Sequence, residues 1–198
     1  MQREDWDRRY QGTELLWTAE PNRFVAAEVA ELPPGRALDL AAGEGRNAVW
    51  LAERGWRVTA VDFSSVALDK AQGLARARGV TADWVLADLR EYRAELRAYD
   101  LVLVAYLQVS PPERARVLHN AVAALAPGGT LLVVGHDLTN LDGGIGGPRD
   151  PVLLYTPESI VAELDGLTVR RAGRVRRRVD TATASGEAVD TLVVATRD

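Results

Sequence analysis

The sequence predicts an α/β fold in which helices cover both faces of a mostly parallel seven-stranded sheet. From residue 36 onward, short apolar runs alternate with segments of helical period, and the last two apolar runs follow each other without a helix between them. With 198 residues, 47% of them hydrophobic, the chain has the size and composition of one globular domain. We expect a single domain over residues 1–198, with an N-terminal arm or lid over residues 1–35 and the core over residues 36–198.

The first half of the core contains three strands and two helices. Gly55 and Gly79 stand where glycine commonly ends a helix, and Ser64 provides a side-chain oxygen that caps the second helix. The strands are expected at residues 36–40, 57–61 and 82–86, with the helices at residues 46–54 and between Ser64 and Gly79.

The second half begins with a short charged helix at residues 90–96 and a strand at residues 99–105. Ser110, Pro111 and Glu113 then form the cap, first-turn proline and capping-box acid of a further helix. A turn of proline and two glycines leads to the fifth strand at residues 130–134, a glycine-rich loop at residues 140–151 and a helix capped by Thr156.

Two strands end the chain. Residues 168–179 carry six arginines, as expected of an edge strand, where charge discourages pairing with other chains. Residues 190–196 are apolar on both faces, which is typical of a strand inside a sheet. We therefore expect the last strand to insert between the fifth and sixth, antiparallel to both.

Composition excludes several kinds of chemistry. The chain has no cysteine, one lysine (Lys70) and two histidines (His119 and His136), which argues against thiolate nucleophiles and metal centres. The net charge of −4 gives no general attraction to nucleic acid or anionic lipid. Neither a signal peptide nor an apolar stretch of ~20 residues is present, so we expect a cytoplasmic protein without a membrane span. The sequence does not indicate an oligomeric state.

The segment Asp39–Asn47, DLAAGEGRN, joins the first strand to the first helix. Its glycines permit a tight turn and a close approach of backbone to ligand, and the helix start offers free N–H groups. Asp62 ends the second strand, where an acid can accept hydrogen bonds from the hydroxyls of a ribose, and Asp88 follows the third strand. The row of acids predicts a site for an extended nucleoside.

This motif, followed by WRVTAVDFS, ADL, YDLVLVAYL and LAPGGTLLVV, resembles the ordered motifs of class I S-adenosylmethionine-dependent methyltransferases. Together with WTAEPN, the GEGRN variant is most similar to the branch of tellurite-resistance and thiopurine-type small-molecule methyltransferases. The resemblance covers about residues 4–198. It implies a Rossmann-like methyltransferase fold with strand order 3-2-1-4-5-7-6, and methyl transfer to a small-molecule acceptor, with S-adenosylhomocysteine as the product and neither nucleic acid nor membrane as a partner.

The resemblance also implies roles for individual residues. Asp39, Ala41 and Gly43 would line the methionine end of the cofactor, and Asp62 would hold the ribose. Phe63, Asp88 and Leu89 would contact the adenine. Ala105 would lie beside the sulfonium, and Trp17 would cover the cofactor from the arm. Arg46 would reach the cofactor carboxylate or cap the loop.

His136 is the candidate proton acceptor because it follows the fifth strand, at the edge where ligand chemistry is expected. Tyr106, Gln108 and Asp137 would border the same opening and bind the acceptor molecule. A structural role for His136 stays open at this point. So does the choice between lid and simple connection for the glycine loop of residues 143–151.

Two alternative functions remain. Gly43, Gly45 and Ala48 also match a loose GxGxxA pattern, which with Asp62 is compatible with a nicotinamide-dependent oxidoreductase. The arginines of residues 170–178 are compatible with a non-catalytic nucleic-acid-binding protein. For the arm, packing of a helix on the side of the sheet is the alternative to a lid.

Overall fold

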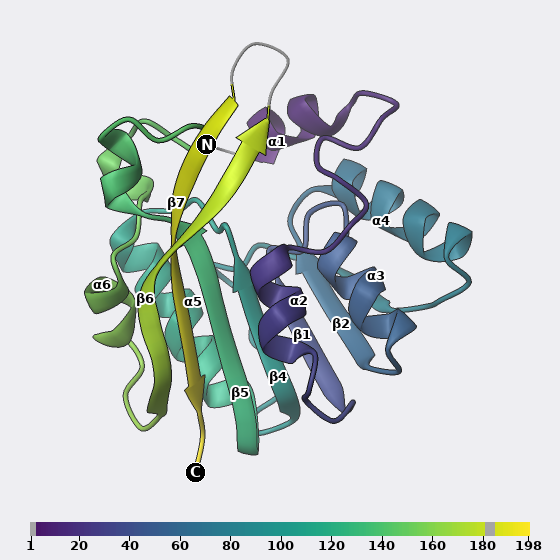
Figure 1. The fold of residues 1–198 in the computed structure, drawn as a ribbon. Helices are drawn as coiled ribbons and strands as arrows, with labels where there is room; N and C mark the ends of the chain where they lie inside the picture. The colour runs from purple at the N-terminus through teal and green to yellow at the C-terminus, as the bar shows by residue number, and fades with distance from the viewer. Residues whose placement is uncertain (1–2, 181–184) are drawn as a thin grey trace.

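The computed structural model describes residues 3–180 and 185–198. One seven-stranded sheet forms its centre, in the order β3-β2-β1-β4-β5-β7-β6 (Figure 1). Neighbouring strands from β3 to β5 are parallel, whereas β7 is antiparallel to both β5 and β6. Order and directions agree with the prediction. The strands are β1 (Arg36–Leu40), β2 (Arg57–Asp62), β3 (Asp83–Leu86), β4 (Tyr99–Ala105), β5 (Leu125–His136), β6 (Thr168–Asp180) and β7 (Ser185–Thr196).

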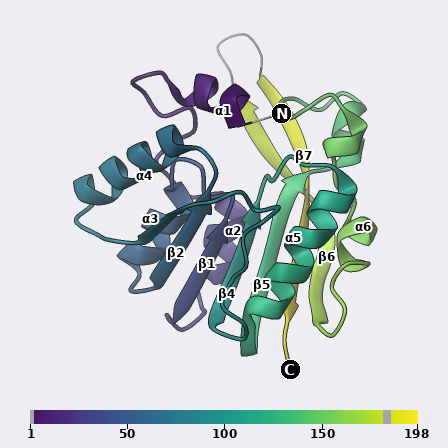
Figure 2. The same ribbon diagram turned by 180° about the vertical axis from the view of Figure 1, so that it is seen from behind.

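Helices cover both faces of the sheet, as seen from the front in Figure 1 and from behind in Figure 2. The α-helices are α1 (Arg3–Tyr10), α2 (Arg23–Val29), α3 (Arg46–Glu53), α4 (Ser65–Ala77), α5 (Pro111–Ala124) and α6 (Pro157–Val161), and the short 3₁₀ helices are η1 (Leu138–Leu141) and η2 (Pro151–Leu153). Among the described helices, none is both long and apolar enough to cross a bilayer.

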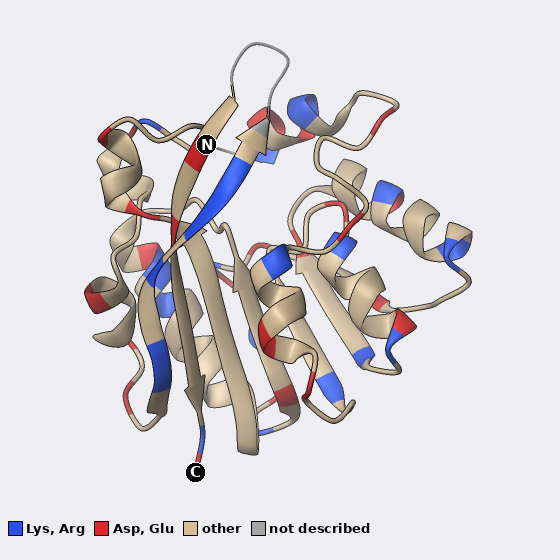
Figure 3. Ribbon diagram, viewed as in Figure 1, with Lys and Arg blue, Asp and Glu red and all other residues tan. Residues whose placement is uncertain are grey.

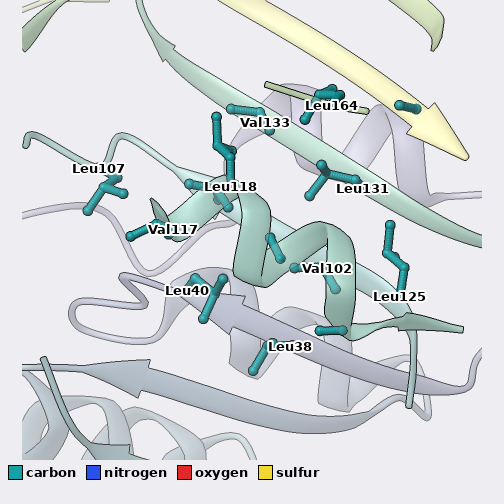
Figure 4. Packing of buried hydrophobic residues seen from close by; sticks show 14 of the residues in the cluster. Leu38, Leu40, Val102, Leu107, Val117, Leu118, Leu125, Leu131, Val133 and Leu164 are labelled. Atoms are coloured by element: carbon teal, nitrogen blue, oxygen red, sulfur yellow. The ribbon is translucent and has the colours of Figure 1, made fainter. Parts of the chain in front are cut away.

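Two apolar cores hold the layers together. On one face, Leu40 and Val102 of the sheet pack against Leu118 of α5, and all three side chains are fully buried (Figure 4). On the other face, Val25 of α2 and Leu51 of α3 pack against the sheet and are equally buried. Removal of this apolar area from water is the main stabilising contribution to the fold.

The prediction of a short helix at residues 90–96 is wrong. The structure has a turn at the start of this segment, closed by hydrogen bonds from the N–H groups of Glu91 and Tyr92 to the carbonyl of Asp88, and no helix follows it. Ala94 is the one buried apolar residue of the segment, and Leu96 is 70% exposed. Without an apolar stripe to pack against the sheet, a short charged segment has little that stabilises a helix.

Strand β6 is the outer strand of the sheet, and basic residues lie along it (Figure 3). Several of these arginines are paired with acids of the same sheet region: Arg174 with Asp137 at 3.0 Å, and Arg177 with Asp190 at 2.7 Å. Because these guanidinium groups already have carboxylate partners, they are poorly suited to phosphate binding.

Candidate active site

A pocket of about 570 Å³ opens at the carboxyl ends of the parallel strands, where the strand order reverses between β1 and β4. Its walls come from the arm, from the segments that follow β1 to β5, and from β6. Asp39 and Asp137 are fully buried and do not belong to its lining. The other residues singled out in the sequence all line it: Trp17, Ala41, Gly43, Arg46, Asp62, Phe63, Asp88, Leu89, Ala105, Tyr106, Gln108 and His136.

The loop between β1 and α3 turns sharply at one side of this pocket. Ala41, Gly43 and Gly45 have φ angles of 64°, 55° and 78°. This left-handed backbone is easily adopted by glycine but costs alanine about 1–2 kcal/mol. The strained alanine is therefore Ala41, while Ala42 has no positive φ and its N–H donates to the Val61 carbonyl at 3.0 Å.

Asp62 fixes that loop from the end of β2. One carboxylate oxygen accepts from the Gly43 N–H at 2.8 Å, and the other accepts from the Ser64 N–H at 2.9 Å. Burial raises the pKa of Asp62, and these N–H groups partly offset the effect. Each oxygen retains a lone pair for a ligand hydroxyl, so Asp62 can hold the loop and a ligand together.

Asp39 lies in β1, with both carboxylate oxygens buried and without a side-chain hydrogen-bond partner in the described chain, and the Ala48 N–H is the backbone group that favours its ionised form. Burial, followed by the charge of Asp62, raises the pKa of Asp39 to about 7, while the charge of Arg46 acts in the opposite direction. A buried carboxylate without a partner is unfavourable. This position therefore favours a cationic ligand group nearby.

Arg46 begins α3 and lines the pocket, and it forms no hydrogen bond or ion pair within the described residues. Burial lowers the pKa of Arg46, whereas Tyr106 and Asp39 favour its charged form. Asp39 and Arg46 thus bring one acidic and one basic group to the same region, and neither has a side-chain hydrogen-bond partner among the described residues. These are the two charges that complement a zwitterionic amino acid group.

Glu44 fastens the arm to the glycine loop. Its buried carboxylate accepts from the N–H groups of Leu16 at 3.0 Å and Trp17 at 3.1 Å. Lys70 Nζ lies 3.0 Å from the same carboxylate and also donates to the Glu14 carbonyl at 2.7 Å. Through these two contacts, the single lysine of the chain links the arm to the core.

Aromatic side chains of the arm cover the loop. Trp6 stacks on Tyr10 with ring centroids 5.7 Å apart, and the Arg9 guanidinium lies over the rings of both Trp6 and Trp17. A Cβ atom on Gly43 would lie 3.1 Å from the Tyr10 hydroxyl. The first part of the arm thus contributes to the lining of the pocket, while α2 packs on the sheet.

Asp88 lies at the far side of the pocket with Phe63 and Leu89. Its carboxylate accepts from the Arg90 side chain, with Nε 2.9 Å from each oxygen, and from the Arg90 N–H at 2.9 Å. The hydrogen bonds from the Arg90 side chain hold the pKa of Asp88 below its usual range. Asp88 is therefore an ionised acceptor at the pocket wall.

The opposite end of the pocket holds a polar cluster. Tyr106 has a φ of 55°, and its ring centroid lies 4.7 Å from that of His136. The Tyr106 hydroxyl donates to Oδ2 of Asp190 at 2.8 Å and accepts from the Asn22 amide at 3.1 Å. Arg177 Nε donates to the same Asp190 oxygen at 2.7 Å.

The placement of Asp137 corrects its assignment to the acceptor site. Its Oδ1 accepts from Thr139 and Arg174, and its Oδ2 accepts from the Thr191 hydroxyl at 2.6 Å. These bonds use the carboxylate to cap η1 and to tie three segments together. Asp137 therefore holds the edge of the sheet beneath the opening and does not face it.

The glycine loop of residues 143–151 lies against His136. A Cβ atom on Gly147 would come within 2.8 Å of the imidazole ring. Two hydrogen bonds anchor the loop: the Asn140 side chain donates to the Gly146 carbonyl at 2.8 Å, and the Ile145 N–H donates to the Glu187 carbonyl at 3.0 Å. The glycine loop therefore packs directly against His136.

Three site residues were missed in the sequence. Glu44 stands between two glycines of a buried turn, and a charged residue at such a place is a usable signal of a buried contact. Asp190 interrupts an apolar strand, which is a signal of a buried, paired carboxylate. Asn22, which accepts from the first N–H groups of α2 as its cap, gave no signal of its contact with Tyr106.

Residues 37–129 match the family model of a methyltransferase domain. A demethylmenaquinone methyltransferase of Thermus thermophilus is 34% identical over 126 residues, which is 62% of this chain and 55% of the relative. A tRNA 5-carboxymethoxyuridine methyltransferase of Escherichia coli is 32% identical over 108 residues, 52% of this chain and 41% of the relative. The chain spans about half the length of the curated relatives it matches.

Solved structures share the fold over nearly the whole chain. A structure from work on the conversion of a disulfide bond into a thioacetal group during echinomycin biosynthesis has a TM-score of 0.80 at 22% identity, covering 99% of this chain and 91% of that one. TehB from Haemophilus influenzae has a TM-score of 0.75 at 16% identity, covering 99% of this chain and 67% of that one. The matching family favours neither an oxidoreductase nor a non-catalytic nucleic-acid binder. Over residues 37–129, this chain is therefore similar to a methyltransferase domain, and the solved structures share its fold.

Proposed function

We propose that this protein transfers the methyl group of S-adenosylmethionine to a small-molecule acceptor. The observation that carries the proposal is that the cofactor residues expected from the sequence, Asp39 excepted, line one pocket at the carboxyl edge of the sheet. Ligands of open α/β sheets bind at this edge, at the point where the strand order reverses. The bound cofactor would supply an electrophilic methyl group.

The residues present fit this cofactor. Among the described residues, the Asp39 carboxylate and the Arg46 guanidinium have no side-chain hydrogen-bond partner, and they would complement the ammonium and carboxylate of a methionine group. Ala41 and Gly43 bring their backbone to the pocket, and Asp62 offers free lone pairs to ribose hydroxyls. Phe63, Asp88 and Leu89 would hold the adenine, and Ala105 would lie beside the sulfonium.

The chain itself would contribute alignment and exclusion of water. Trp17 and Tyr10 cover the pocket from the arm, and Glu44 holds that segment in place through two backbone N–H groups. Bringing two bound molecules to within about 3–3.5 Å in the correct orientation lowers the barrier without a covalent enzyme intermediate. The absence of cysteine therefore does not conflict with the chemistry.

The acceptor would bind beside Tyr106, Gln108 and His136, with His136 as the proton acceptor. The GEGRN and WTAEPN motifs favour the tellurite-resistance and thiopurine-type branch, whose acceptors are small molecules. We propose further that the protein is cytoplasmic. A nucleic acid acceptor is less well supported, because Arg174 and Arg177 are paired with buried carboxylates.

Release of S-adenosylhomocysteine would test this function directly. We expect release when the protein is given S-adenosylmethionine and one member of a panel of thiols, phenols, amines and oxyanions such as tellurite, and none with bulk tRNA. Asp62→Ala serves as the control and should release far less product with the same acceptor. Release with tRNA alone would contradict a small-molecule acceptor.

Replacing Trp17 by alanine should weaken S-adenosylhomocysteine binding about tenfold, because the indole that covers the pocket is lost. Leu16→Ala is the matched control. Leu16 donates its N–H to the same Glu44 carboxylate and is similarly exposed, at 37% against 41% for Trp17, but it does not line the pocket. Isothermal titration calorimetry of both variants measures the difference. Equal affinities would contradict a covering role for Trp17.

A further inference from the structure

His136 and Asp190 face each other across the antiparallel pair of β5 and β7. The two residues are direct register partners, and Nδ1 of His136 lies 3.2 Å from Oδ1 of Asp190. The contact is at ion-pair distance, and neither of these two buried atoms forms a hydrogen bond within the described chain. Within the described chain, Nδ1 of His136 and Oδ1 of Asp190 therefore have only each other as possible partners.

The second oxygen of Asp190 is firmly held. Oδ2 accepts from the Tyr106 hydroxyl at 2.8 Å and from Arg177 Nε at 2.7 Å, and the Asp190 side chain is fully buried. Burial opposes its ionisation, but hydrogen bonding to His136 and the charge of Arg177 outweigh this effect and lower the pKa of Asp190. Asp190 is thus an ionised carboxylate with one oxygen fixed and the other toward the imidazole.

We propose, on the basis of the proposed function, that Asp190 is a positioning residue for His136 and that the acceptor carries a neutral O–H or N–H group. By accepting from Nδ1–H, Asp190 keeps the ring proton on that nitrogen and leaves Nε2 for the pocket. The acceptor proton passes to Nε2, and the electron pair of the broken O–H or N–H bond stays on the heteroatom. The carboxylate of Asp190 balances the resulting imidazolium charge.

The neighbouring Asp137 shows what a purely structural carboxylate looks like at this edge. It is equally buried, but both of its oxygens are used by hydroxyl and arginine donors of the fold. Asp190 has the same kinds of donor on one oxygen only, with the imidazole at the other. The two carboxylates therefore differ in one contact: Asp190 faces the imidazole of His136, and His136 lines the pocket.

The tautomer of His136 tests this proposal without an acceptor. The chain contains two histidines, so a long-range ¹H–¹⁵N spectrum of the imidazoles at alkaline pH shows two rings, with His119 as the internal reference. We expect the proton of His136 on Nδ1 in the wild type. In Asp190→Asn, whose amide can donate to Nδ1, we expect a shift toward the tautomer with the proton on Nε2.

Asp137→Asn is the matched control and should leave the His136 tautomer unchanged, although it removes an equally buried carboxylate. A wild-type His136 with its proton on Nε2 would overturn the proposal, and this result does not depend on any variant folding. Equal tautomer shifts in the two variants would overturn it as well, since the effect would then come from general loosening of the sheet edge.

The reactivity of Nε2 gives a second measurement. Diethyl pyrocarbonate transfers an ethoxycarbonyl group to an unprotonated imidazole nitrogen, and peptide mass spectrometry separates modification of His136 from that of His119. We expect His136 to react several-fold more slowly in Asp190→Asn and His119 to react equally in both proteins. An unchanged His136 rate would contradict the positioning role. Calorimetry with S-adenosylhomocysteine tests the proposed function separately, because cofactor binding does not depend on the His136 tautomer.

Discussion

Replacement of Asp62 by alanine is expected to weaken the binding of S-adenosylhomocysteine about 100-fold, or about 3 kcal/mol. Two lost interactions contribute to this weaker binding. The ribose hydroxyls lose their carboxylate acceptor, and the Gly43 N–H loses the partner that holds the glycine loop at 2.8 Å. Isothermal titration calorimetry of the variant and the wild type measures the loss.

The same substitution affects folding, because Asp62 also accepts from the Ser64 N–H. We expect the free energy of unfolding of the ligand-free protein to fall by about 1–3 kcal/mol in urea denaturation. Asp69→Ala, on the exposed side of α4, is the control and should change neither quantity. Unchanged affinity in Asp62→Ala would contradict the assignment of Asp62 to the ribose.

Replacement of Asp39 by asparagine is expected to stabilise the ligand-free protein at neutral pH and above. Burial raises the pKa of Asp39 from 3.8 to about 7. Between these values the unfolded chain loses the proton while the folded chain keeps it, so the free energy of unfolding of the wild type falls as pH rises through this range. The loss amounts to about 4 kcal/mol at most, and Asp39→Asn should lack it.

Urea denaturation of both proteins at several pH values checks this result. Asp137→Asn is a control of opposite sign, because hydrogen bonds from Thr139 and Thr191 outweigh the effect of burial and lower the pKa of Asp137. Its ionised form therefore stabilises the fold above the ordinary pKa, and the variant should be less stable at neutral pH. Parallel pH profiles for wild type and Asp39→Asn would contradict an unpaired Asp39 carboxylate.

The places of the last two strands were predictable because they depend on local patterns, whereas the full strand order was implied by the family resemblance. The apolar residues of β7 and the arginines of β6 place one strand inside the sheet and the other at its edge. The helix expected at residues 90–96 failed because its composition suits a helix while its position offers no surface to pack on. Leu96 is exposed there, and packing rather than propensity stabilises short helices.

The residues of the candidate site also divide into those that local sequence patterns predict and those that depend on contacts between distant segments. Gly43, Asp62 and Asp88 lie in loops or strand ends that the sequence pattern places at one edge, so their position in the pocket lining was predictable. Asp190 reaches His136 only through the register of β5 with β7, a contact between residues that are distant along the chain. Asp137 was misplaced because a strand end fixes the position of a residue but not the side to which its carboxylate turns.

Calorimetric titration of the purified protein with S-adenosylhomocysteine tests the central claim most directly. We expect one molecule to bind per chain, with Asp62→Ala and Trp17→Ala each weakening the binding and Leu16→Ala leaving it unchanged. Binding that none of the pocket variants alters would place the ligand elsewhere. No binding by a folded wild-type protein would contradict the assignment of this pocket to S-adenosylmethionine.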